Sequence, residues 1–192
     1  MRIIAGKYRS RVLEAPAGMA TRPTGDRLRE TLFNVLAPRI EGAALLDLYA
    51  GSGAVGLEAL SRGAGRVEFV ERAELALRAL RKNLEKLGIA QGFKIHGVGV
   101  GSVLHKMKAG AGDELGFDLV FLDPPYDAAA EYDATLGLLG GAGVTLLAEG
   151  AVVIAEHRKK ERLEERYGVL ERTRLLEQGD AALSFYARGA GD

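Results

Sequence analysis

The sequence has 192 residues, of which 47% are hydrophobic and 27% charged, as in an ordinary soluble globular protein with one well-buried domain. It contains no cysteine, which excludes disulfides, thiolate metal ligands and cysteine nucleophiles. The formal net charge is zero, no segment reaches the roughly 20 apolar residues of a membrane span, and residues 1–7 lack the apolar core of a signal peptide, so we expect a cytoplasmic protein.

The charge is unevenly distributed along the chain. Residues 1–40 carry eight arginines and lysines against three acidic residues, which gives a net charge of +5 and leaves −5 for the rest. A basic segment on an acidic body predicts a face that contacts phosphates. A solvated surface of mixed charge is the alternative interpretation.

The first forty residues are expected to form a hairpin and a helix. Apolar pairs around a Gly-Lys turn predict a β-hairpin over residues 2–15, and a loop follows from Pro16 to Pro23. Thr24 is the expected N-cap of a helix that Pro38 ends. The apolar residues on one face of that helix are Leu28, Leu32, Val35 and Leu36.

From about residue 43 onward, apolar runs typical of strands alternate with helical patterns. The expected strands are Ala43–Tyr49, Arg66–Glu71, Phe93–Gly97, Asp118–Leu122 and Ala151–Glu156, followed by a hairpin of Val169–Glu177 and Ala182–Arg188. One expected helix follows the glycine loop and ends near Leu60. The other expected helices are Ala73–Leu87 (with Gly88 as C-cap), Val103–Met107, Ala129–Leu139 and the mixed-charge surface helix Glu161–Arg166. This alternation predicts a mostly parallel sheet with helices on both faces, whose ligands bind beyond the carboxyl ends of the strands.

The first candidate site is the run Asp47–Gly56, where a strand leads through a glycine turn into a helix. Gly51 and Gly53 allow positive φ and let a ligand lie against bare backbone, and Gly56 lets the helix approach the sheet closely. Glu71 follows Gly51 by twenty residues, at the end of the next expected strand, and suits the hydroxyls of a ribose. Asp47 would repel a pyrophosphate but favours a cationic ligand such as S-adenosylmethionine, which carries an ammonium and a sulfonium. A turn that merely connects strand to helix is the alternative.

The second candidate site is the tetrapeptide Asp123-Pro124-Pro125-Tyr126, which follows the apolar run Leu119–Leu122. The two prolines fix the backbone. Asp123 and the Pro124 carbonyl can then accept both hydrogens of an amino group, and Tyr126 offers a face for an unstacked base. Asp123 can also stabilise the charge that develops on nitrogen or take its proton. A rigid loop with an ordinary surface tyrosine is the alternative interpretation.

With both motifs present, the chain resembles the bacterial small-subunit ribosomal RNA guanine-N2 methyltransferases of the RsmD family. The likeness lies in residues 2–11, 22–34, 47–63, 83–84, 123–126 and 185–186. It implies an α/β, Rossmann-like class I methyltransferase fold with a mostly parallel seven-stranded sheet, helices on both faces and an antiparallel C-terminal hairpin strand. Residues 1–20 would be an RNA-contacting β-hairpin extension, and residues 21–192 the methyltransferase domain.

The resemblance also implies the ligands and the residues that bind them. S-adenosylmethionine would contact Asp47, Tyr49, Gly51, Ser52, Gly53, Glu71, Arg72, Gly101, Ser102 and Asp123. The target amine of a guanine in 16S ribosomal RNA, within a small-subunit particle, would meet Asp123, Pro124, Pro125 and Tyr126. The RNA would contact Arg9, Arg11, Arg22, Thr24, Arg27 and Arg29, although solvated helix charges are the alternative for Arg27 and Arg29. We expect a monomer without a metal.

The sequence departs from this family in two places. Many relatives have an acidic residue where this chain has Ala73. The third strand usually leads to an Asp or Asn near the adenine, whereas here it leads to the run Gly97–Ser102. Gly101 holds that polar position, so a backbone N–H or the Ser102 hydroxyl is left to bind adenine.

Other functions compete with this interpretation. A DNA adenine-N6 methyltransferase uses the same tetrapeptide but usually needs a separate recognition domain, for which the chain has no room. A nicotinamide-dependent oxidoreductase is opposed by Asp47 and by the absence of a Tyr-x-x-x-Lys motif. A catalytically silent RNA-binding module leaves residues 123–126 unexplained. His96, His105 and His157 are too scattered for a metal site, and His157 with the basic run 158–160 predicts a surface patch.

Overall fold

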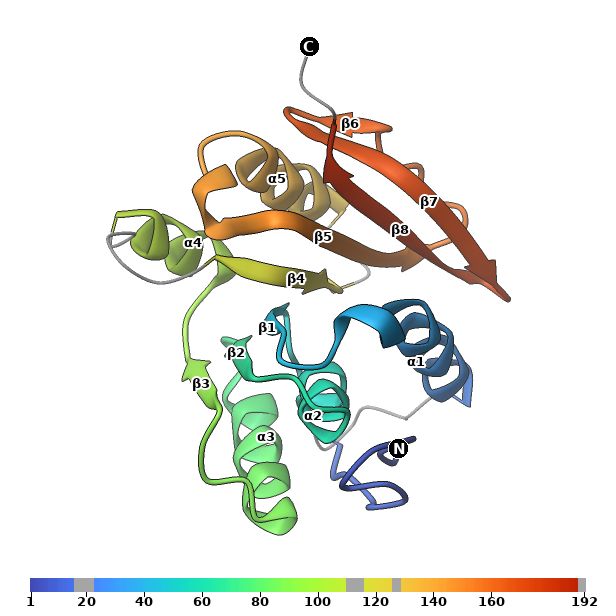
Figure 1. Ribbon diagram of the computed structural model, residues 1–192, viewed down its shortest axis with the longest axis vertical. Coiled ribbons are helices and arrows are strands. Elements are labelled where there is room, and N and C mark those ends of the chain that lie inside the picture. The colour runs from blue at the N-terminus through green and yellow to red at the C-terminus, as the bar shows by residue number, and fades with distance from the viewer. Residues whose placement is uncertain (16–22, 110–115, 126–128, 190–192) are drawn as a thin grey trace. The chain divides into compact units, whose positions relative to one another are not determined.

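The computed structural model describes residues 1–15, 23–109, 116–125 and 129–189 (Figure 1). These residues form two compact units, Met1–Gly99 and Val100–Asp192, which are considered separately. Tyr126 and Arg22 lie outside the described residues.

The first unit contains a parallel sheet whose strands lie in the order β3, β2, β1. Its elements are α1 (Pro23–Leu36), a 3-10 turn (Ala37–Arg39), β1 (Ala44–Leu48), α2 (Ala54–Ser61), β2 (Arg66–Val70), α3 (Glu74–Leu87) and β3 (Phe93–His96). Four of the five residues of β1 and of β2 are buried, as expected for strands covered on both faces. α2 packs against both of these strands (Figure 1).

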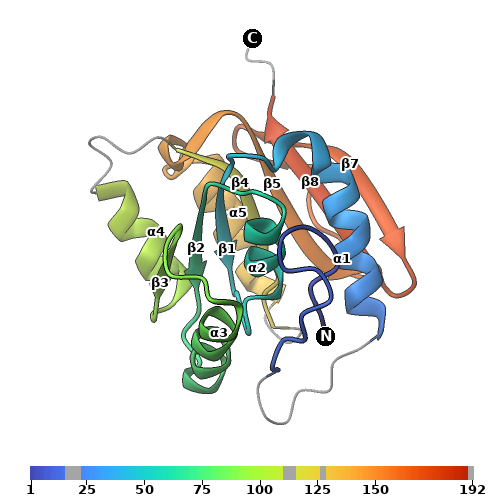
Figure 2. The ribbon, with the colours of Figure 1, turned by 60° about the horizontal axis from the view of Figure 1, so that its bottom comes forward.

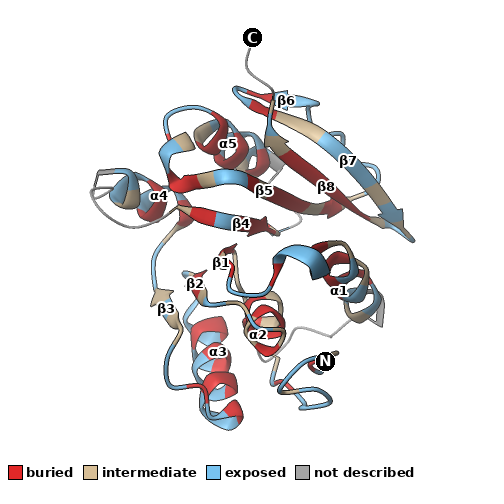
Figure 3. Cartoon of the chain, viewed as in Figure 1, coloured by how far each residue is buried: buried red, intermediate tan, exposed pale blue. Residues whose placement is uncertain are grey.

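α3 shows how closely the sequence pattern fixes an element. Ala76, Leu77, Leu80 and Leu84 recur at helical spacing and are buried, while the opposite face is exposed (Figure 3). Gly88 ends the helix with φ +68°, and its amide bonds the Glu85 carbonyl. The predicted C-cap is confirmed.

The second unit combines one parallel and several antiparallel strand pairs. Its elements are α4 (Val100–Ala109), β4 (Phe117–Leu122), α5 (Ala129–Gly140), a 3-10 turn (Val144–Leu146), β5 (Leu147–Arg158), β6 (Arg166–Tyr167), β7 (Leu170–Gln178) and β8 (Ala181–Arg188). β4 pairs parallel with β5, and β5, β8, β7 and β6 follow in antiparallel order. Figure 3 shows that β8 is buried along most of its length, whereas β7 consists mainly of intermediate and exposed residues.

Three local predictions differ from the structure. The helix α1 begins at Pro23, so Thr24 lies inside it and is not the N-cap; proline suits a first helical position because its missing N–H would have no partner there. Residues 2–15 contain one antiparallel bridge, Arg2 to Val12, in place of a ladder of strands. α4 begins at Val100, three residues earlier than expected.

Residues 161–166 are not helical, contrary to expectation. The described residues form eight strands, and the strand beyond the expected seven is β6. Tyrosine hydroxyls hold this segment: the Glu164 amide donates to Tyr167 Oη (3.1 Å), and Tyr186 Oη donates to the Glu164 carbonyl (2.9 Å). Tyr167 Oη itself donates to Asp133 Oδ1 on α5 (2.7 Å). The mixed charges supplied no apolar stripe that could have stabilised a helix instead.

His157 is buried in β5 and is not part of a surface patch, contrary to the sequence-based expectation. Its Nδ1–H donates to the Arg158 carbonyl (2.9 Å), which leaves Nε2 to accept the Ser184 hydroxyl (2.9 Å). Burial, aided by the charge of Arg172, lowers the pKa of His157 and outweighs the opposing effects of the Arg158 carbonyl and Glu161. The neutral imidazole is therefore part of the core.

Stability should fall as this imidazole becomes charged. Because the pKa of His157 is lower in the folded than in the unfolded chain, its contribution is complete above the ordinary value of 6.5 and is lost as the pH falls through and below it. Urea denaturation at several pH values between 8 and 5.5 measures the free energy of unfolding. As the pH falls, this free energy should decrease more steeply for the wild type than for His157→Gln. The control His105→Gln changes an exposed histidine and should keep the wild-type slope. Equal slopes for all three proteins would contradict the assignment.

Candidate functional site

The glycine loop between β1 and α2 divides into positions that serve packing and one that faces open space. A Cβ on Gly53 would lie 2.3 Å from Leu80 Cδ1, and one on Gly56 would lie 2.2 Å from Phe69 Cε1. A Cβ on Gly51 would meet nothing within 4 Å. The backbone has positive φ at Gly51 (+56°), Gly53 (+82°) and the non-glycine Tyr49 (+60°). Gly51 thus presents bare backbone to the surroundings, and Gly56 permits the close packing of α2 that the sequence predicted.

Asp47 is a buried carboxylate one residue before the end of β1. The side chain is 1% exposed, and Oδ2 accepts a hydrogen bond from the Gly56 amide (2.9 Å). That amide belongs to the first turn of α2, where the helix dipole favours negative charge. Asp47 therefore fastens the end of the strand to the start of the helix, and its contact with a cationic ligand stays a prediction.

Glu71, just after β2, holds the other side of the loop. Oε2 accepts the Gly51 amide (2.9 Å), while Oε1 accepts the amides of Arg72 and Ala73 (2.7 Å each). A carboxylate has about four acceptor positions, so these three bonds leave capacity for a ligand hydroxyl. The side chain is partly exposed. Glu71 is thus oriented by backbone at the position predicted to meet a ribose.

Asn83, one of the residues in the family likeness, has a specific structural role. From α3, its Nδ2 donates to the Ser52 carbonyl (3.0 Å) and to the Glu14 carbonyl (3.0 Å). Its Oδ1 accepts the Glu14 amide (2.8 Å). One buried amide therefore ties the glycine loop to the N-terminal segment. An asparagine in an otherwise leucine- and charge-rich helix is the signal that could have revealed it.

In the second unit, β4 leads into residues Asp123, Pro124 and Pro125. Pro124 is buried, Pro125 is exposed and Asp123 is partly exposed. Burial raises the pKa of Asp123 from its ordinary 3.8 to about 7. A carboxyl with such a pKa exchanges protons near neutrality, which suits a group that accepts hydrogens from an amine.

The remaining predicted cofactor residues are placed as follows. Ser52 is buried, and Arg72 is exposed. Gly101 and Ser102 lie in the first turn of α4 and are exposed. Because α4 starts before them, the run after β3 supplies helical backbone at this point and not a loop.

The predicted RNA contacts separate into exposed and buried residues. Arg9, Arg11 and Arg27 are exposed, and only the backbone of Thr24 is described. Arg29 is 6% exposed and donates through one terminal guanidinium nitrogen to the Arg2 carbonyl (2.6 Å) and Asp26 Oδ1 (3.0 Å). The structure therefore corrects the surface role expected for Arg29, since a phosphate contact requires an accessible guanidinium.

Within residues 1–15, 23–109, 116–125 and 129–189, no cluster of three or more His, Asp or Glu side chains could hold a metal ion. In the same residues, no helix is long and apolar enough to cross a membrane.

Comparisons with known proteins cover nearly the whole chain. A profile of the family described as "Conserved hypothetical protein 95" matches residues 1–187. The Bacillus subtilis protein named "Putative rRNA methyltransferase YlbH" is 37% identical over 188 residues, 98% of this chain and 99% of its own. The Escherichia coli protein named "Ribosomal RNA small subunit methyltransferase D" is 38% identical over 156 residues, 81% of this chain and 74% of its own.

A solved structure is similar along the same length. The "Putative methyltransferase yhhF from Escherichia coli" is 37% identical, with a TM-score of 0.82, and the match covers 100% of this chain and 99% of that one. The predicted Rossmann-like methyltransferase fold is therefore confirmed.

Proposed function

The chain belongs to the family described as conserved hypothetical protein 95, and we propose that it methylates the exocyclic N2 amine of a guanine in small-subunit (16S) ribosomal RNA, with S-adenosylmethionine as the donor. The observation that carries this proposal is the Asp-Pro-Pro segment at the end of buried strand β4, where the pKa of Asp123 is about 7. The names of the relatives support ribosomal RNA as the substrate class.

The glycine loop fits a nucleoside that lacks phosphates. Acidic side chains hold it at Asp47 and Glu71, and a pyrophosphate beside them would be repelled. Gly51 leaves open space for a ligand against the backbone, and Glu71 keeps acceptor capacity for ribose hydroxyls. When bound, S-adenosylmethionine supplies an electrophilic methyl group on a sulfonium.

The chemistry assigned to Asp123 is to hold and polarise the amine. The ionised carboxylate accepts an N–H, and the Pro124 carbonyl accepts the other, which orients the nitrogen lone pair. The nitrogen forms its bond to the methyl carbon as the carbon–sulfur bond breaks, and one N–H proton then leaves toward Asp123 or water. Positioning of the amine supplies most of the rate enhancement, because the sulfonium readily loses its methyl group and leaves as a neutral thioether.

A nucleic-acid substrate is supported by the distribution of charge. The exposed Arg9, Arg11 and Arg27 belong to the basic first forty residues, while the rest of the sequence is acidic. A DNA adenine-N6 methyltransferase, the second candidate, would use the same amine-binding segment. We propose that the protein acts as a cytoplasmic monomer on a small-subunit particle.

Identification of the labelled nucleoside tests the substrate and the position of methylation. The protein is incubated with tritiated S-adenosylmethionine and either small-subunit particles lacking the modification, naked 16S ribosomal RNA or DNA, and the product is digested and separated. We expect label in N2-methylguanosine from the ribosomal substrates. Label in N6-methyladenine, or no label with any substrate, would refute the proposal.

A further inference from the structure

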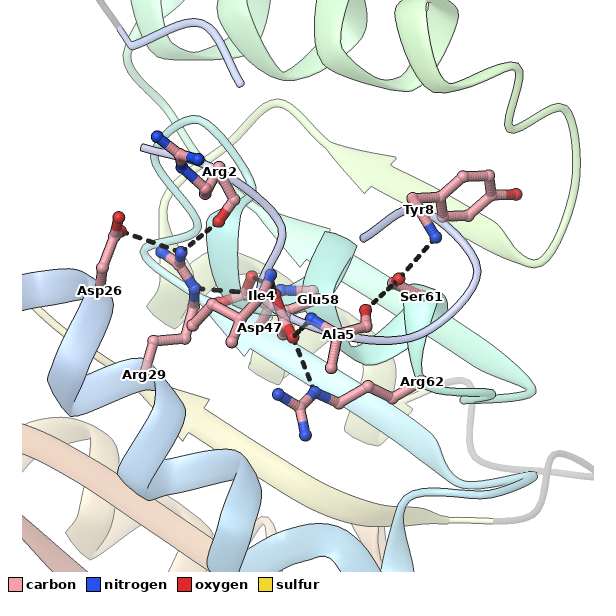
Figure 4. Close-up of polar contacts among 11 residues, drawn as sticks. Arg2, Ile4, Ala5, Tyr8, Asp26, Arg29, Asp47, Glu58, Ser61 and Arg62 are labelled. Atoms are coloured by element: carbon pink, nitrogen blue, oxygen red, sulfur yellow. Dashed lines mark hydrogen bonds and ion pairs between the residues drawn. The ribbon is translucent and has the colours of Figure 1, made fainter. Parts of the chain in front are cut away.

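We propose that Glu58 is a positioning residue that clamps the N-terminal loop, residues 1–13, so that its basic side chains meet RNA in one fixed arrangement. This inference rests on the proposed function and concerns how the RNA is bound. Glu58 lies in α2, and its carboxylate binds the Ile4 and Ala5 amides and the Arg62 guanidinium. Figure 2 shows the loop beside α2, and Figure 4 shows Glu58 among the contacts.

The carboxylate of Glu58 is fully buried and binds backbone amides of the loop directly. The Ile4 amide donates to Oε2 (2.7 Å), and the Ala5 amide donates to Oε1 (3.0 Å). Arg62, the C-cap residue of α2, pairs with Oε1 (2.7 Å). Two successive loop amides and one cation therefore converge on a single side chain.

Ser61 grips the next turn of the loop. Its hydroxyl accepts the Tyr8 amide (2.9 Å) and donates to the Ala5 carbonyl (2.5 Å), and its own carbonyl accepts the Lys7 amide (2.7 Å). Gly6 lies against this point with φ +81°, and a Cβ there would be 1.8 Å from the Ser61 carbonyl oxygen. Only glycine permits this approach.

Arg29, from α1, fixes the beginning of the loop. Besides its bonds to the Arg2 carbonyl and Asp26, it places Nε 4.0 Å from Glu58 Oε2. This Nε has no hydrogen-bond acceptor in the described part of the chain, so its interaction with Glu58 is one of charge. Asn83 holds the far side at Glu14, just beyond the loop.

The basic side chains of the loop form no ion pair with acidic side chains of the described residues. Arg2, Lys7, Arg9 and Arg11 are all exposed, and in the described residues none of them forms an ion pair with an acidic side chain. The loop has no acidic residue, whereas the buried Glu58 is matched by Arg29 and Arg62. Four positive side chains on a backbone fixed at several points form a preorganised phosphate-binding surface.

Stabilisation of the fold alone does not explain why an acid is buried at this position. Burying a carboxylate costs free energy that an apolar side chain of similar size would avoid, so an ion pair in the interior is weak grounds for a stabilising role. Backbone amides of an irregular loop, however, need an acceptor, and Glu58 supplies two. What Glu58 adds is a defined loop conformation, which reduces the entropy lost when RNA binds.

The test compares Glu58→Gln with the control Glu74→Gln. Glu74 pairs with Arg78 at the same i,i+4 spacing, but on the exposed surface of α3, so both variants remove one negative charge from a helical ion pair. Binding of a fluorescent 16S ribosomal RNA fragment is measured by anisotropy at several salt concentrations. We expect Glu58→Gln to weaken binding about 10-fold and to reduce the slope of log Kd against log[salt] by about one to two, which corresponds to the loss of about two phosphate contacts. Glu74→Gln should match the wild type.

Turnover separates positioning from catalysis. Glu58→Gln should raise the KM for RNA substrate by about 10-fold and leave kcat and the Kd for S-adenosylmethionine within about twofold of the wild type. A fall in kcat with an unchanged KM would overturn the proposal. Hydrogen exchange should also be faster at the amides of Ile4, Ala5 and Tyr8.

A double-mutant cycle tests the coupling directly. Lys7, Arg9 and Arg11 are replaced together by alanine in the wild type and in Glu58→Gln. If the clamp positions these side chains, the triple replacement weakens RNA binding much less in the Glu58→Gln background. Equal losses in the two backgrounds would overturn the proposal, as would an absence of RNA binding by the wild type. If Glu58→Gln unfolds, Ser61→Ala takes its place in the cycle with the same expectations.

The two proposals fail in different ways. RNA binding and the cycle need no turnover, so a wild type that binds RNA without methylating it would refute the proposed function and still test the clamp. Conversely, a Glu58→Gln protein with wild-type affinity and salt dependence would refute the clamp and leave the methylation assay unaffected.

Discussion

Replacing Asp123 by alanine is expected to lower methyl transfer by about 10³-fold, while the protein still binds S-adenosylmethionine through the other residues assigned to the donor. The reason is that the carboxylate is assigned to the amine, and its loss removes both the orienting hydrogen bond and the group that stabilises charge on nitrogen. Single-turnover kinetics and calorimetric titration measure the two quantities. The control Asp118→Ala removes an exposed acid from the same strand and should be active. Near-normal turnover of Asp123→Ala would exclude the assigned role.

The pH profile gives the same assignment a second test. Since burial raises the pKa of Asp123 to about 7, the side chain is largely protonated at pH 6 and largely ionised at pH 8. Only the ionised form can both accept the amine N–H and later take its proton, so kcat/KM should rise about tenfold in all between pH 6 and pH 8 and level off above that range. Asp123→Asn should be slower and lose this dependence. A flat wild-type profile between pH 6 and 8 would contradict the role of the carboxylate.

The second large effect distinguishes two glycines of one loop. Gly53→Ala should lower the free energy of unfolding by about 3 kcal/mol, because it combines positive φ with a Cβ 2.3 Å from Leu80. Gly51→Ala should cost only about 1 kcal/mol, since its Cβ enters open space and the backbone strain alone remains. Gly51→Ala should nevertheless weaken donor binding at least about 10-fold, because the methyl group occupies the space assigned to the ligand.

Urea denaturation and titration with S-adenosylhomocysteine measure these effects. Each variant is the control for the other, because both place alanine at positive φ in the same turn. Equal destabilisation by the two substitutions, or unchanged ligand affinity in a folded Gly51→Ala protein, would contradict the division of roles.

The parts of the fold that follow from local patterns were predictable. Residues close together in the sequence determine the apolar stripe of α3, its C-cap at Gly88 and the buried strand before Asp123. The structure confirms these elements. The packing role of Gly56 also followed from its spacing in the loop.

The errors arose where a residue's partner is distant in sequence. Arg29 looks like a surface cation because nothing nearby shows that the Arg2 carbonyl, 27 positions away, accepts from it. Glu58 is likewise explained by Ile4 and Ala5, more than fifty positions away. An acid inside the otherwise apolar run of α2 was the available signal that its side chain is buried and bound.

His157 was misplaced although a local signal existed. Ala151, Val153 and Ala155 are buried at alternate positions of β5, and His157 continues that period of two. The basic residues 158–160 suggested a surface patch, but the alternation of buried residues continues one residue beyond the end of the predicted strand. For an isolated polar residue, strand periodicity was the better guide.

The clamp on the N-terminal loop also bears on how this protein could acquire new targets. Glu58, Ser61 and Arg29 hold the loop through its main-chain amides and carbonyls. The side chains that point outward form none of these hydrogen bonds. Gly6 is different, because the close approach to Ser61 requires that it have no side chain. Lys7, Arg9 and Arg11 can therefore be replaced, by mutation or by design, with little effect on the conformation of the loop backbone. Recognition can diversify here independently of folding.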